Sequence, residues 1–78
     1  MKNYKLYAGM TGEFEILKTD APESVVINYI MACSNMELPG NDPELFFTEK
    51  GYHIEFLGCQ YDDININFDT EIDTYDYI

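Results

Sequence analysis

The most regular pattern of polar and apolar residues lies in the segment DDININFDTEID, residues 62–73. Ile64, Ile66, Phe68 and Ile72 share one parity, and acidic or amide residues occupy most of the other. Side chains alternate between the two faces of a strand, so a period of two over about ten residues is typical of a strand with one buried face. We therefore predict a long final strand with Phe68 in the core and an acidic outer face.

Two earlier segments alternate in the same way and predict a hairpin. In residues 3–9 the apolar side chains at even positions share one face, and a short connection bounded by glycines follows. In residues 13–18 we expect Phe14 and Ile16 to point toward the core and Glu15 to point toward solvent.

Helix signals follow the predicted hairpin. Asp20 can cap a helix, Pro22 fits its first turn, and apolar residues then recur at helical spacing to about Met36. A second start at Asp42 predicts a helix of one or two turns, closed by Gly51 in the left-handed conformation.

A third strand is predicted over residues 52–57, which completes the order β-β-α-short α-β-β. The chain is 46% hydrophobic and 15% aromatic, which is more than disordered chains carry, so residues 1–78 should fold as a single domain. We predict an α+β fold: a mostly antiparallel four-stranded sheet with one main helix packed on its apolar face.

The final segment also matches the start of a calcium-binding loop. Asp63, Asn65 and Asn67 have the spacing of the first EF-hand ligands. The position that needs a glycine for the sharp turn holds Phe68, however, and the position of the bidentate glutamate holds Thr74. We therefore expect a strand here and no calcium site.

Nucleophilic and zinc chemistry would depend on Cys33, His53 and Cys59. No lysine or arginine lies near either cysteine to favour a thiolate, and a structural zinc site needs four ligands. We predict a protein that is not an enzyme and has no cofactor or metal. A small enzyme that uses Cys/His or carboxylate chemistry is the alternative. The two cysteines form no CxxC motif, and a Cys33–Cys59 disulfide stays open.

Charge changes the picture more than any motif does. The chain has fifteen acidic residues, four lysines and no arginine, for a formal net charge of -11. Residues 51–78 hold seven of the acids and none of the lysines. Such a field disfavours direct binding to nucleic acid or to an anionic membrane, and it speeds encounter with basic surfaces. No apolar leader or bilayer-length segment is present in the sequence, so we expect a cytoplasmic protein with reduced thiols.

The C-terminal acidic segment also holds several of the seven tyrosines, and tyrosine is enriched in interface cores. It supplies the predicted partner-binding residues: Asp62, Asp63, Asp69, Glu71, Asp73, Tyr75, Asp76 and Tyr77. In size, charge and lack of catalytic residues, the chain resembles the small acidic inhibitors of bacteriophages and mobile elements. These are anti-CRISPR and anti-restriction proteins, some of which are DNA mimics.

That resemblance covers no motif, and it implies a basic partner such as a nucleic-acid-binding nuclease or effector complex. The alternative is an assembly module that forms a homodimer through an edge strand, because a long final strand is a natural site for β-pairing. Both a monomer and a homodimer are compatible with the sequence.

Overall fold

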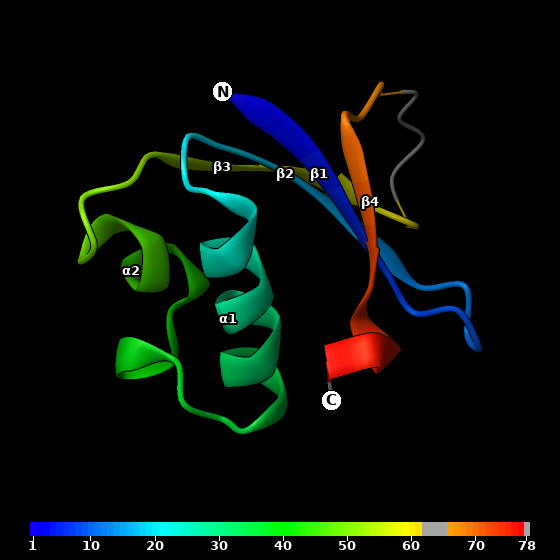
Figure 1. Cartoon of the computed structure of the whole chain (residues 1–78). Coiled ribbons are helices and arrows are strands. Elements are labelled where there is room, and N and C mark those ends of the chain that lie inside the picture. Colours follow the sequence, from blue (N-terminus) through cyan, green and yellow to red (C-terminus); the bar gives the residue numbers. More distant parts are fainter. Residues whose placement is uncertain (62–65, 78) are drawn as a thin grey trace.

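The computed structural model describes residues 1–61 and 66–77, and it has an α+β fold (Figure 1). A four-stranded sheet has the order β3-β2-β1-β4, and both α-helices lie on one side of it. The class and the main helix on one sheet face are therefore confirmed. In chain order the elements are β1 (Lys2–Tyr7), β2 (Phe14–Thr19), α1 (Glu23–Ser34), η1 (Pro39–Asn41), α2 (Pro43–Thr48), β3 (Ile54–Cys59), β4 (Thr70–Asp73) and η2 (Thr74–Tyr77), where η marks a 3-10 helix.

The sheet is mixed, so the prediction of a mostly antiparallel sheet is wrong. β2 pairs antiparallel with β1 and with β3, whereas β4 pairs parallel with β1. Consecutive strands β3 and β4 therefore lie at opposite edges of the sheet. The parallel register sets Ile72 beside Leu6, and both side chains are buried on the side of the helices.

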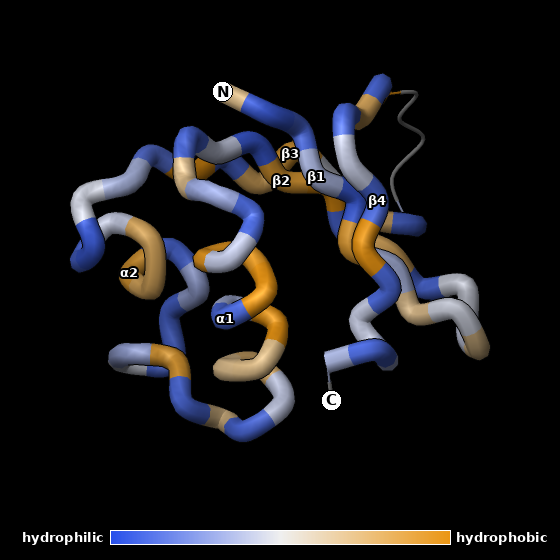
Figure 2. The backbone as a smooth tube through the Cα atoms, viewed as in Figure 1, coloured by the Kyte–Doolittle hydropathy of each residue, from blue (hydrophilic) through white to orange (hydrophobic). Residues whose placement is uncertain are grey.

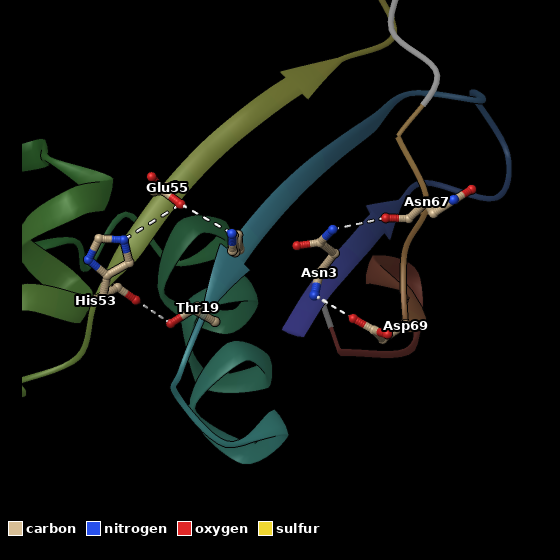
Figure 3. Close-up of polar contacts among 7 residues, drawn as sticks. Asn3, Thr19, His53, Glu55, Asn67 and Asp69 are labelled. Carbon is tan, nitrogen blue, oxygen red and sulfur yellow. Dashed lines mark hydrogen bonds and ion pairs between the residues drawn. The ribbon is translucent and has the colours of Figure 1, made fainter. Parts of the chain in front are cut away.

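The predicted long final strand is also wrong over residues 66–69, because β4 begins only at Thr70. Asn3 of β1 holds the segment before β4 through its side chain and its backbone (Figure 3). The Asn3 Nδ2 donates to the Asn67 carbonyl at 3.0 Å, and the Asn3 amide donates to the Asp69 carboxylate at 2.9 Å. Asp62 and Asp63 lie outside the described residues.

Phe68 is not in the core, in contrast to the prediction. Its side chain is 41% exposed, and the Lys5 ammonium lies 5.3 Å from the centre of its ring. Ile72 does face the core and is 5% exposed. The sequence does alternate here. Asn3, however, forms hydrogen bonds with Asn67 and Asp69, and these bonds take the place of regular strand pairing before Thr70.

The two faces of β2 are the reverse of the prediction. Its register with β1 sets Glu15 beside Leu6 and Leu17 beside Tyr4, on the side of the helices. Ile16 is also buried, but on the opposite face of the sheet. Because adjacent residues of this inner strand are both buried, the alternation of apolar residues does not identify the helix-facing side.

The core lies between the sheet and the helices, where apolar segments of both layers face each other (Figure 2). Val26 and Ile30 of α1 pack in the same cluster as the fully buried Leu17. The Tyr29 ring lies 5.0 Å from the ring of Phe47, which is also fully buried. These contacts hold α1 against the sheet and against α2.

The helix ends follow the sequence in part. Asp42 caps α2 by accepting a hydrogen bond from the Glu44 amide at 3.0 Å, and Gly51 is left-handed with φ 84°, as predicted. Asp20 does not cap α1, because its carboxylate accepts from the His53 amide at 2.8 Å instead. That bond ties the start of β3 to the end of β2.

A left-handed residue also ends α1. Met36 has φ 57°, while the Glu37 amide bonds the Ala32 carbonyl and the Met36 amide bonds the Cys33 carbonyl. This pair of bonds is a Schellman motif, in which glycine is the usual left-handed residue.

Candidate functional site

The described part of the predicted partner-binding surface lies on β4, on η2 and at Asp69, the residue before β4. β4 is an edge strand that pairs only with β1 among the described residues, and η2 continues directly from it. The two tyrosines are about two-fifths exposed, with Tyr75 at 40% and Tyr77 at 39%. We call the four carboxylates of this region the acidic edge: Asp69, Glu71, Asp73 and Asp76.

Two carboxylates of the acidic edge also hold local structure. Asp69 accepts from the Asn3 amide, and Asp73 accepts from the Tyr75 amide at 3.0 Å at the start of η2. A Cβ added to Gly9 would lie 3.0 Å from the Asp73 carboxylate, so glycine allows the hairpin connection to approach it. Glu71 and Asp76 are exposed.

No lysine neutralises the acidic edge within the described residues. The ion pairs among the described residues are instead those of Glu55 on β3, whose carboxylate lies 4.0 Å from Lys18 and 3.6 Å from His53 (Figure 3). Lys5 is next to Glu71 in the sheet register, but its ammonium lies over the rings of Phe14 and Phe68. The edge therefore keeps its negative charge at the surface.

The effect of that charge reaches β1. Desolvation raises the pKa of the Tyr7 hydroxyl, and the carboxylates of Asp73, Glu71 and Asp76 raise it further. Tyr7 pairs with Asp73 in the parallel register. The acidic edge thus acts on the neighbouring strand.

A hollow of about 470 Å³ adjoins the acidic edge, where the hairpin end of the sheet meets the C-terminal half of α1. Its charged lining residues are both glutamates. The lining comes from β1, the hairpin connection, β2, α1, β3, the residue after β3 and η2: Leu6, Tyr7, Ala8, Glu13, Phe14, Glu15, Ile30, Cys33, Ser34, Cys59, Gln60 and Thr74.

A carboxyl group with an unusual environment lies in this hollow. The Tyr29 hydroxyl donates to the Glu15 Oε1 at 3.3 Å. Burial raises the pKa of Glu15, and the bond from Tyr29 offsets this only in part. Burial also raises the pKa of Tyr29 and of Cys33. The alternation of apolar residues did not reveal this cluster, because it predicts Glu15 on the solvent side of its strand.

The structure places the two cysteines together at the hollow and separates His53 from Cys59. Cys33 and Cys59 are not joined by a disulfide, and both line the hollow. His53 precedes β3 and Cys59 ends it, which separates them by about 20 Å along an extended chain. The raised pKa of Cys33 is the reverse of what activates a thiol nucleophile.

Within residues 1–61 and 66–77, no three Cys, His, Asp or Glu side chains come together as a possible metal site. None of the helices in this part of the chain has the length and apolar character needed to cross a bilayer. Comparison with protein-family models, with curated protein sequences and with solved structures finds no match to this chain.

Proposed function

We propose that this chain is a binding protein without enzymatic activity that engages a basic protein surface through its acidic edge. One observation carries the proposal. The edge strand β4, the residue before it and the 3-10 helix after it present four carboxylates without a neutralising cation among the described residues, next to the half-exposed Tyr75 and Tyr77. Carboxylates steer a basic partner to the surface, and tyrosines supply contact area once it is bound.

A nucleic-acid-binding protein suits this surface as a partner. Glu71 and Asp73 are two positions apart on β4, which corresponds to about 6.6–6.8 Å along a strand. Two phosphate steps along one DNA strand span a similar distance, at roughly 3.4 Å each. A basic nucleic-acid channel in a nuclease or effector complex would accept either the DNA phosphates or these carboxylates. This is the mode of action of the DNA-mimicking phage inhibitors that the chain resembles.

A neutralised variant tests the proposal. Asparagine and glutamine keep an acceptor oxygen, so Asn at Asp69 and Asp73 can still accept the bonds from Asn3 and Tyr75. The test variant combines Asp69→Asn, Glu71→Gln, Asp73→Asn and Asp76→Asn. The control combines four exposed glutamates on or near the helices: Glu23→Gln, Glu37→Gln, Glu44→Gln and Glu49→Gln.

The partner is captured from the native host with the wild type and purified, and its binding kinetics are then measured at about 50 and 150 mM salt, where screening differs. We expect the test variant to associate at least tenfold more slowly at low salt and the control to change less than threefold. Tyr75→Ala or Tyr77→Ala should instead speed dissociation. Equal association rates for test variant and wild type would refute the proposal, and competition by duplex DNA tests the mimic mechanism.

The edge-strand homodimer loses its original basis. β4 has only four residues instead of a long strand, and pairing two copies would bring their Glu71 and Asp73 carboxylates together. We therefore propose that the chain does not form a dimer through β4. Light scattering at about 100 µM, near the concentration scale of weak association, checks this.

A further inference from the structure

We propose that the hollow beside the acidic edge receives one arginine side chain of the basic partner. Its guanidinium would meet the Glu15 carboxylate, and its aliphatic stem would lie along Leu6 and Ile30. This inference rests on the function proposed above and adds the group that the partner inserts.

The charge of the hollow favours a cation. Its charged lining residues in the described chain are Glu13 and Glu15, and the donor that the structure gives Glu15 is the neutral hydroxyl of Tyr29. A partly buried carboxylate with one neutral donor is poorly compensated, and burial accordingly raises the pKa of Glu15. A cation would supply the missing compensation and make the carboxylate more favourable in the complex than in the free protein.

Arginine fits the hollow better than lysine does. The volume of about 470 Å³ is within the range of roughly 300–1,000 Å³ that is typical of ligand pockets. Leu6 and Ile30 give its wall an apolar surface, on which a long basic side chain can lay its stem. A guanidinium is less strongly hydrated than an ammonium and can make two parallel hydrogen bonds to a carboxylate, so it loses less on partial burial.

The position of the hollow links it to the acidic edge. Tyr7 and Thr74 both line it. Tyr7 pairs with Asp73 of β4, and Thr74 begins η2. A partner steered by the edge would therefore bring its basic side chains to the mouth of the hollow. The edge would set the rate of encounter, and the hollow would set how long the complex lasts.

A small probe tests the site without the partner. The ¹⁵N-labelled full chain is titrated at constant ionic strength with butylguanidinium or with butylurea, which has a similar shape and no charge. We expect saturable shifts of the Glu15, Cys33 and Cys59 amides with butylguanidinium and at least tenfold weaker binding of butylurea. Glu15→Gln keeps an acceptor for Tyr29 and should weaken butylguanidinium binding at least tenfold. The control Glu44→Gln should change it less than twofold.

Two results of the titration overturn the proposal: equal binding of butylurea, or unchanged butylguanidinium binding by Glu15→Gln. The second arm measures partner dissociation, which Glu15→Gln should speed about tenfold. If Glu15→Gln leaves partner dissociation unchanged while the wild type binds the probe, the hollow binds small cations only. That result would overturn the proposal that it receives an arginine of the partner. The neutralised-edge variant retains Glu15, so its failure to slow partner association would refute the proposed function without affecting the probe result.

Discussion

Phe68→Ala tests the clearest difference between the sequence pattern and the structure. Truncation of a core phenylalanine to alanine typically lowers the free energy of unfolding by about 3–5 kcal/mol. Phe68 is 41% exposed, so only part of that cost applies. Its ring also loses the Lys5 ammonium at 5.3 Å, which is worth about 0.5–1 kcal/mol at an exposed site. We expect a total cost of about 2 kcal/mol.

Phe47→Ala is the matched comparison. Phe47 is 0% exposed, and its ring packs 5.0 Å from Tyr29, so its truncation should cost the full amount of about 3–5 kcal/mol. A chain of 78 residues has a small core, so the loss of Phe47 can leave the variant unfolded even before urea is added. That outcome also meets the expectation, because it places Phe47 above Phe68 in cost.

The assay is urea denaturation followed by circular dichroism. For a small domain the free energy of unfolding falls by about 1 kcal/mol per molar urea, so Phe68→Ala should lower the midpoint by roughly 2 M. Asn67→Ala is the control: this side chain is exposed and should contribute less than about 0.5 kcal/mol. Equal costs for Phe68→Ala and Phe47→Ala would refute the surface position of Phe68, and no cost would refute its packing against Lys5.

Two further substitutions test local strain and burial. Met36→Gly should raise the free energy of unfolding by about 0.5–1 kcal/mol in urea melts, because the residue is left-handed and 89% exposed; a loss of stability would contradict this. Glu15→Gln tests the raised pKa of Glu15: the folded wild type retains its proton to higher pH than the unfolded chain, so its stability should fall as pH rises above the ordinary carboxyl pKa of 4.5. Urea melts should therefore show that the unfolding free energy of Glu15→Gln relative to wild type is higher at pH 7 than at pH 4. An equal difference at both pH values would contradict the burial of a carboxyl group.

Much of the fold follows from local chemistry. The element order, the Asp42 cap and the left-handed Gly51 are set by neighbouring residues, and the sequence predicts them correctly. The pairing of β4 with β1 depends on which edge of the sheet remains open after β3 has paired with β2. Alternation of side chains specifies faces and not neighbours, so it cannot supply that information.

The candidate site divides in the same way. The carboxylates of the acidic edge could be grouped from the sequence because they are close together in it: they lie just before β4, on β4 and on η2. The hollow could not, because Glu15, Cys33 and Cys59 come from three separate elements. The sequence did hold one signal: Glu15 shares its parity with Leu17 and Thr19. Choosing Leu17 rather than Ile16 as the residue that faces the core would have predicted Glu15 on the side of the helices.

The parallel pairing of β4 with β1 also has a consequence for the order of folding. Asn3 and Asp69, which are bonded across it, are 66 residues apart in the chain. Closing so large a loop costs entropy before any contact compensates, whereas β1 and β2 meet across a short connection. The hairpin can therefore assemble early, and we expect β4 with η2 to join late. On that expectation the acidic edge belongs to the last segment to dock, so a partner bound to it would also stabilise the folded chain.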